Sequence, residues 1–253
     1  MSAAATKIRF TPVQGQMAGI VEDAPAFPGD RFSLGFPEAI GDAAQAIWYG
    51  SMKPQWKQDA QDRRCWVAAG RQEGELSYTL TITPHEDFVD ADIALTNESA
   101  RAWKHGMAFN CFNCGGSSLR DNECLRHFVR VGGKFQRLVA TPRTFGPRPT
   151  IQLYGVEGGP PTGEIPFVSN FRCTSPAVAE GWMAIVAPDG KRLVAAVSRP
   201  ALFLFQNMEY SCIHSAPGFG PIRPGETKRA KTRLYFVSAT LEEWHRRMRS
   251  EMA

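Results

Sequence analysis

A strand–turn–strand pattern between residues 75 and 97 constrains the fold of this chain most strongly. Apolar and polar residues alternate over positions 76–82, and the alternation resumes over positions 89–95. The polar segment from Pro84 to Asp87 separates the two runs. A period of two on both sides of a short polar turn predicts an antiparallel hairpin with one buried face. The fold therefore contains at least one half-buried antiparallel sheet.

The rest of the chain extends this pattern into an all-β protein. Further strands are predicted at Cys65–Ala69, Met107–Phe112, His127–Val131, Trp182–Ala187, Leu193–Val197, Leu202–Phe205 and Arg233–Val237. The 23 glycines and 18 prolines favour many turns over long helices. A chain of 253 residues can bury one large core without disulfides. We therefore predict a single domain over residues 1–253, built as a twisted antiparallel β-sandwich.

Helices are predicted at two places, and a long loop at a third. Thr240 and Glu243 form a capping-box pattern, which predicts a short C-terminal helix docked through Trp244. A weaker helical pattern covers Pro37–Tyr49. Residues 142–166 are rich in proline and glycine and are predicted to form a long surface loop.

Composition excludes several classes of protein. The net charge of +4 is small for this length and gives no concentrated basic face, so nucleic-acid binding is not expected. No run of about 18 apolar residues is present, so no membrane-spanning helix is predicted. Residues 1–7 do not resemble a secretory signal, and we expect a cytoplasmic location. The six cysteines are then expected to be reduced, buried thiols, including the lone CxxC pair Cys111 and Cys114.

Two segments concentrate polar and ionisable side chains between apolar runs. The first is residues 105–113, and the second is residues 206–226. Together with the strand over 89–97, which ends in Thr-Asn, these segments resemble the galactose mutarotase-like superfamily. The matching features are a histidine shortly before Phe109-Asn110, and a carboxylate strand followed by Pro224-Gly225-Glu226 and a last strand with an aromatic end.

This resemblance covers about half the chain and implies a β-supersandwich fold with a site on its concave sheet. It also implies carbohydrate-active chemistry, namely an epimerase, lyase or hydrolase. The spacing from His105 to Phe109 is one residue longer than in the epimerase pattern, and Glu209 lies closer to Pro224. The resemblance therefore bears on the fold more directly than on the activity.

Acid–base chemistry on a sugar or sugar acid requires a group that gives a proton and one that takes it. Histidine and carboxylate side chains can be tuned for both roles, and His105, Glu209 and His214 are the predicted catalytic residues. The predicted partner is a small sugar or oligosaccharide, and this chemistry requires no cofactor. The predicted substrate-binding residues are an anion clamp, two hydroxyl-binding amides and a stacking ring: Arg126, Asn110, Asn207 and Trp182.

Other interpretations remain open for the same residues. A histidine in a strand often has a structural role, and Arg126 fits a surface charge. A divalent metal could bind Glu209, Cys212 and His214, completed by His105, but a regular strand points residue 209 away from 212 and 214. The chain could also be a non-catalytic carbohydrate-binding or interaction module. An enzyme would bring its histidines and carboxylate into one cleft, whereas a binding module would present an open aromatic face.

Overall fold

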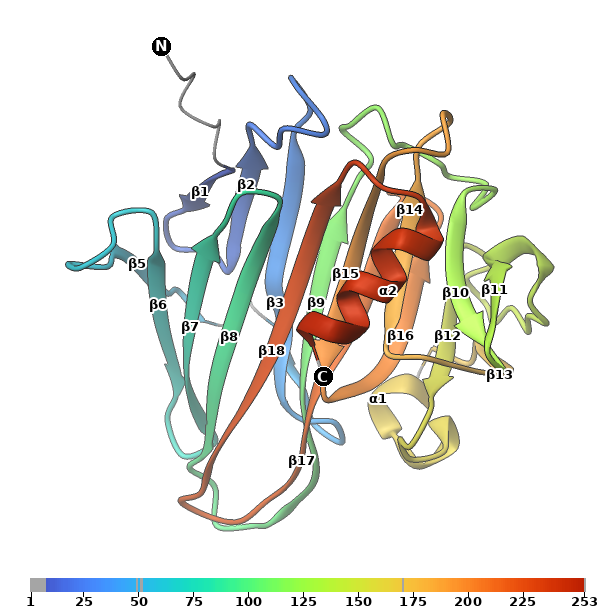
Figure 1. Ribbon diagram of the computed structural model, residues 1–253. Helices are drawn as coiled ribbons and strands as arrows, with labels where there is room; N and C mark the ends of the chain where they lie inside the picture. Colours follow the sequence, from blue (N-terminus) through green and yellow to red (C-terminus); the bar gives the residue numbers. More distant parts are fainter. Residues whose placement is uncertain (1–7, 49, 51, 170, 253) are drawn as a thin grey trace.

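A computed structural model describes residues 8–48, 50, 52–169 and 171–252 of the chain. Within these residues the chain forms eighteen strands and two α-helices (Figure 1). The strands are β1 (Arg9–Val13), β2 (Ala18–Glu22), β3 (Phe32–Asp42), β4 (Ile47–Trp48), β5 (Gln55–Gln58), β6 (Trp66–Gln72), β7 (Leu76–Pro84), β8 (Phe88–Asn97), β9 (Trp103–Asn113), β10 (His127–Val131), β11 (Lys134–Arg137), β12 (Ile151–Val156), β13 (Thr174–Ala179), β14 (Trp182–Val186), β15 (Leu193–Arg199), β16 (Ala201–Asn207), β17 (Cys212–Ile222) and β18 (Thr227–Val237). The helices are α1 (Pro166–Ser169) and α2 (Leu241–Glu251).

Strand pairing joins all eighteen strands into one continuous sheet that folds into two layers, called sheet I and sheet II, with the short β4 paired to β3 of sheet II. Sheet I runs β5–β6–β7–β8–β18–β15–β14–β10–β11, all antiparallel. Sheet II runs β1–β2–β3–β9–β17–β16–β12, also antiparallel, and β13 joins β12 in parallel. Strand β13 also touches β10, which links the two sheets at one edge. The predicted antiparallel β-sandwich is confirmed, and the hairpin over 75–97 is the pair β7–β8.

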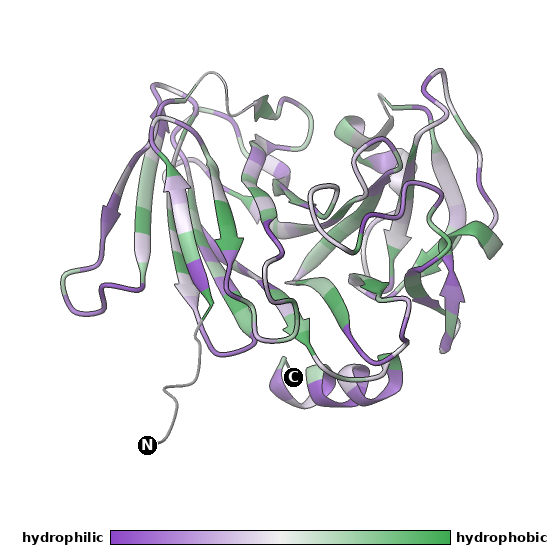
Figure 2. Ribbon diagram, turned by 90° about the horizontal axis from the view of Figure 1, so that it is seen from above, coloured by the Kyte–Doolittle hydropathy of each residue, from purple (hydrophilic) through white to green (hydrophobic). Residues whose placement is uncertain are grey.

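The two sheets face each other across the main hydrophobic core. Phe32 on β3 and Phe112 on β9 both contact Phe236 on β18, with ring centroids 5.1 and 5.5 Å apart. Alternate residues of β9 point the other way, because side chains alternate across a strand. Phe109 accordingly belongs to a second buried cluster on the outer face of sheet II. Hydrophilic and hydrophobic segments alternate along several strands, as Figure 2 shows.

Helix α2 covers part of the outer face of sheet I (Figure 1). Trp244 is fully buried there, against Trp182 of β14 and Tyr235 of β18. Thr240 caps the helix, because its side chain accepts from the Glu243 amide while the Glu243 carboxylate accepts from the Thr240 amide. The predicted C-terminal helix and its capping box are confirmed. Among the described residues, no helix is long and apolar enough to cross a membrane.

Two predicted elements differ from the structure. The helix predicted over Pro37–Tyr49 is wrong, because residues 32–42 form β3 and pair with β9; Tyr49 lies outside the described residues. The predicted loop over 142–166 contains β12, whose residues 151–156 are all buried. Sequence patterns did not predict this short strand, because prolines and glycines flank it and neither of its faces is exposed, so it shows no alternation of polar and apolar residues.

Candidate functional site

A cavity of about 340 Å³ opens on the outer face of sheet II. Strands β3, β9, β16 and β17 form its floor, and the segments after β11, α1 and β16 contribute to its walls. Its polar lining residues are Glu38, Cys111, Asn113, Arg148, Asn207, Cys212 and His214. Its aromatic lining residues are Trp48, Phe109, Phe171, Phe205 and Tyr210. A cavity with aromatic walls and a few convergent polar groups is typical of a small-molecule site.

A bulge in β3 positions Glu38 at this cavity. Gly35 pairs with Cys111 and Ala39 pairs with Phe109. Between these two pairs, β3 has three residues where β9 has one. Such bulges re-aim side chains and are frequent beside active sites. A Cβ atom at Gly35 would lie only 2.7 Å from the Cγ atom of Glu38. Glycine at this position therefore leaves the space that the Glu38 side chain crosses.

His214 on β17 is buried and held in one tautomer. Its Nδ1 lies 3.0 Å from the carbonyl oxygen of Phe205, which can only accept a hydrogen bond, so Nδ1 carries the proton. The ring stacks on Phe109 with centroids 4.6 Å apart. Burial lowers the pKa of His214 to about 3, so the imidazole is neutral at physiological pH. Its Nε2 atom therefore keeps a lone pair that can take a proton or bind a metal.

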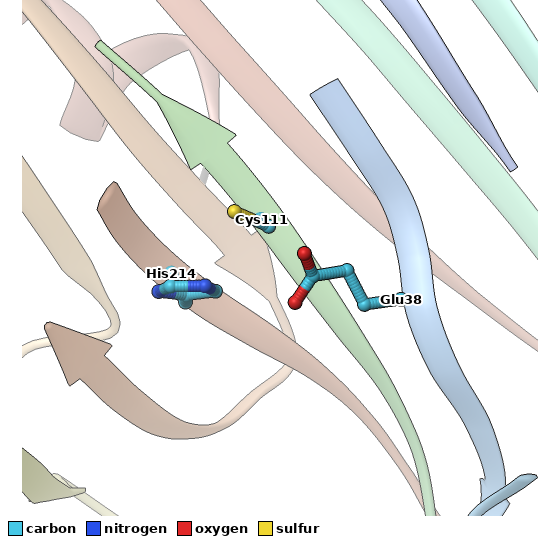
Figure 3. A group of neighbouring side chains, drawn as sticks. All are labelled: Glu38, Cys111 and His214. Carbon is cyan, nitrogen blue, oxygen red and sulfur yellow. The ribbon is translucent and has the colours of Figure 1, made fainter. Parts of the chain in front are cut away.

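Cys111 on β9, which pairs with β17, and Glu38 on β3, the next strand along, converge on His214 (Figure 3). One carboxylate oxygen of Glu38, the Cys111 Sγ and one ring nitrogen of His214 all lie within 4.8 Å of one another. Burial raises the pKa of Glu38, although a hydrogen bond with Cys111 offsets part of the rise. The hydrogen bond with Cys212, at an Sγ–Sγ distance of 3.4 Å, and burial raise the pKa of the Cys111 thiol well above its usual value. The cluster thus combines a carboxyl group with a raised pKa, a neutral thiol and a neutral imidazole.

An ion pair borders the mouth of the cavity. The Nε atom of Arg148 lies 3.0 Å from Oε1 of Glu209, and the Thr150 hydroxyl donates to the same oxygen at 2.6 Å. The hydrogen bond from Arg148 lowers the pKa of Glu209 to about 2, so this carboxylate is ionised. Half of the Arg148 side chain remains exposed beside the cavity.

The structure brings several of the predicted site residues to this cavity. His214, Asn207 and Cys212 line it directly. Glu209 follows Asn207 closely, and the Oδ1 atom of Asn207 accepts from the Glu209 amide at 2.9 Å. Glu209 contacts the cavity through Arg148 rather than lining it.

Other predicted residues lie elsewhere. His105 is on β9, six residues before Cys111 and so about 20 Å along the strand, near Lys104 and Glu164. Asn110 points into the core between the sheets, where its amide donates to Thr232 at 2.8 Å.

Trp182 and Arg126 also lie away from the cavity. Trp182 packs beneath α2, and its indole nitrogen donates to Glu180 at 2.9 Å. The guanidinium of Arg126 donates to the carbonyl oxygens of Arg120 and Val186. The Arg126 guanidinium thus has carbonyl partners, whereas Trp182 borders a separate cavity together with Glu180, Gly181 and Arg199.

Only two of the four predicted metal ligands lie at this cavity. Cys212 and His214 line the cavity, but neither Glu209 nor His105 belongs to the cluster of possible ligand atoms around His214. Glu38 and Cys111 occupy those places.

Sequence reasoning missed Glu38, Cys111 and Arg148. Glu38 falls in the segment predicted as a helix, and Cys111 was interpreted as a structural thiol. Arg148 falls in the predicted loop. A usable signal was present for Cys111, because it shares a strand face with Phe109 next to the polar Asn113. The residues around Glu38 in the sequence give no signal of its role, because its position depends on the pairing of β3 with β9.

Similarity to solved structures identifies the fold. A galactose mutarotase-related enzyme from Lactobacillus acidophilus matches with a TM-score of 0.50 and 9% identity, covering 92% of this chain and 98% of that one. A galactose mutarotase-like protein from Clostridium acetobutylicum matches with a TM-score of 0.51 and 8% identity, covering 92% and 99%. The chain has the galactose mutarotase-like fold.

The same fold occurs inside a larger enzyme. An α-N-acetylgalactosaminidase from Bifidobacterium bifidum matches this mutarotase-like chain with a TM-score of 0.51 and 9% identity, covering 99% of this chain but 39% of that one. No protein-family model and no curated protein sequence matches the chain. The resemblance read from the sequence is thereby confirmed at the level of the mutarotase-like fold.

Proposed function

We propose that this protein is a carbohydrate-active enzyme that transfers protons on a small sugar or sugar acid, in the cavity between Glu38 and His214. The observation that carries the proposal is the pairing of a protonation-prone carboxyl group with a neutral imidazole, within 4.8 Å of each other at a cavity of about 340 Å³. General acid–base catalysis needs one group of each kind within hydrogen-bond reach of the substrate. Mutarotase-like proteins and a glycosidase share the fold, which agrees with this proposal.

In this mechanism His214 is the base and Glu38 is the acid. The Nε2 lone pair of His214 accepts a proton from a sugar hydroxyl, while the Phe205 carbonyl stabilises the imidazolium through Nδ1. Glu38 donates its proton to the ring oxygen bonded to the same carbon. The bond between that carbon and the ring oxygen breaks, and the deprotonated hydroxyl oxygen becomes a carbonyl. The distance of at most 4.8 Å between the Glu38 oxygen and the His214 nitrogen suits two oxygens attached to one carbon, as in the exchange of sugar anomers. Inverting hydrolysis instead needs its two carboxyl groups about 6.5–9.5 Å apart.

The remaining groups at the cavity bind and orient the substrate. The rings of Phe171 and Phe205 offer apolar surface to the carbon face of a sugar. Asn207 offers an amide to a hydroxyl. The Nε–Nη2 edge of Arg148 is taken by Glu209, and its remaining Nη hydrogens can donate to a ligand carboxylate. Glu209 holds Arg148 in place as a positioning residue. A sugar acid is therefore the favoured substrate within this class.

Anomeric exchange measured by NMR on a panel of reducing sugars and uronic acids tests the proposal. We expect the wild-type protein to accelerate exchange for at least one member of the panel. Glu38→Gln and His214→Gln should each lower the rate by about 100-fold or more, because each removes one proton-transfer group. The matched controls Glu73→Gln and His85→Gln, both away from the cavity, should keep the wild-type rate. Wild-type rates in both cavity variants, or no acceleration for any sugar, would refute the proposal.

A second candidate is a non-catalytic carbohydrate-binding module. The observation in its favour is that Trp48 and Tyr210 line the cavity with exposed fractions of 49% and 53%. Exposed aromatic rings at a cavity mouth are suited to sugar binding without chemistry. Calorimetric binding of a sugar whose anomeric exchange is not accelerated would select this candidate over the enzyme.

A further inference from the structure

The donor atoms at the cavity differ in kind. Cys111 offers sulfur, His214 nitrogen and Glu38 oxygen, from three adjacent strands of sheet II. Thiolate and imidazole ligands select thiophilic metals such as zinc, whereas calcium and magnesium prefer oxygen alone. This mixed set is therefore unsuited to a hard cation and suited to a thiophilic one.

The geometry of the cluster is close to what zinc requires. The three donor atoms lie within 4.8 Å of one another, and ligand atoms in a tetrahedral zinc site are about 3.5 Å apart. The donor atoms would therefore approach one another by roughly 1 Å on metal binding. Three protein ligands leave a fourth coordination position open to water or another ligand.

The surroundings of the cluster also match a metal site. The Nδ1 proton of His214 donates to the Phe205 carbonyl at 3.0 Å, and metal-binding histidines usually donate their second nitrogen to such an acceptor. The Cys212 sulfur lies 3.4 Å from the Cys111 sulfur and can donate to it once Cys111 is a thiolate. The hydrogen bonds that orient the ligands are thus already in place.

We propose that Cys111, His214 and Glu38 form a binding site for one thiophilic divalent metal ion, with zinc as the biological candidate. A bound ion occupies the lone pair of His214 and the carboxylate of Glu38. Proton transfer by these two groups and metal binding therefore exclude each other, and the ion inhibits the enzyme. This inhibitory consequence rests on the proposed function, whereas the binding itself does not.

Titration of the metal-free protein with Co²⁺, in the presence of a non-thiol reductant and without oxygen, tests the site directly. We expect a thiolate-to-cobalt charge-transfer band that saturates at one ion per chain and disappears on addition of one equivalent of Zn²⁺. Cys111→Ser should abolish the band and weaken zinc binding by about 100-fold or more, because even outer-shell changes cost about 10–100-fold. The control Cys65→Ser changes a buried thiol outside the cavity and should keep the band.

The wild-type titration keeps the test decisive even if Cys111→Ser fails to fold. Absence of the charge-transfer band in the reduced wild-type protein would overturn the proposal, as would an unchanged band in folded Cys111→Ser. Inhibition of sugar turnover by Zn²⁺ is measured separately. A cobalt band without any sugar turnover would refute the proposed function and leave the metal site standing, so the two failures are distinguishable.

Discussion

At the scale of single residues, burial and ion pairing shift the pKa values of two carboxyl groups in opposite directions. Glu38 is half-buried beside a neutral thiol, and this burial raises its pKa. Glu209 is paired with Arg148, and that hydrogen bond lowers its pKa to about 2. The first carboxyl group suits an acid, and the second suits a fixed charge that orients a neighbour. The sequence predicts Glu209 rather than Glu38 as a catalytic residue, because burial and pairing are properties of the folded chain.

Arg148→Ala tests the preference for an acidic substrate. Loss of a charge-assisted pair with a carboxylate costs about 1.5–3 kcal/mol, so kcat/KM for a uronic acid should fall about 10- to 100-fold. The matching neutral sugar should lose much less, because it has no carboxylate. Steady-state kinetics with the two sugars measures the difference, with the exposed Arg246→Ala as control. Equal losses for both sugars would show that Arg148 does not recognise a carboxylate.

Asp90→Asn tests the ion pair between Asp90 and Arg233, which lie on neighbouring strands of sheet I. Both carboxylate oxygens of Asp90 accept from Arg233, at 2.7 and 2.9 Å, and both side chains are mostly buried. Breaking such a pair costs about 3 kcal/mol in the free energy of unfolding. Burial opposes ionisation of Asp90, but the hydrogen bond and charge of Arg233 prevail and lower its pKa.

The stability that Asp90 contributes is therefore present above its unfolded pKa of 3.8 and is lost as the pH falls below that value. Urea unfolding at a series of pH values should show the gap between wild type and Asp90→Asn narrowing in that window. Asp92→Asn, which changes an exposed neighbour, should cost less than about 1 kcal/mol. A gap that stays constant with pH would contradict this account of the pair.

At the scale of elements, visible alternation depends on whether one face of a strand meets solvent. Strands β7 and β8 carry polar residues on their outer face, so their period of two was readable and the hairpin was predicted. Strand β12 is buried on both faces, and its six residues show no alternation. In β3, the bulge before Ala39 breaks the period, and the segment resembled a helix. Tertiary pairing with β9 decides its conformation.

Trp244→Ala tests how much α2 contributes to the stability of sheet I. The indole is fully buried, with its centroid 4.9 Å from that of Trp182. Truncation of a buried tryptophan leaves a cavity and costs about 3–5 kcal/mol in the free energy of unfolding. Chemical denaturation measures this, and Arg246→Ala on the exposed side of the helix should change stability by no more than about 0.5 kcal/mol. A cost below about 1 kcal/mol for Trp244→Ala would mean that the helix is not docked as described.

At the scale of the whole molecule, the cavity is assembled from residues far apart in the sequence. Glu38, Cys111, Arg148 and His214 come from β3, β9, a connecting segment and β17. Hydrophobic patterns and family resemblance predicted the sandwich and grouped His214, Asn207 and Cys212, which line one cavity. They could not show which strands are neighbours in sheet II, so His105 was grouped with residues about 20 Å away. Non-local pairing is the step that local patterns do not encode.

A crystal structure of the protein soaked with the most reactive sugar of the panel tests the central claim most directly. We predict that the sugar lies in the cavity of sheet II, with one hydroxyl in hydrogen-bond contact with Nε2 of His214 and an adjacent oxygen in contact with Glu38. A sugar bound elsewhere, or bound in this cavity with both groups out of reach of its oxygens, would contradict the account.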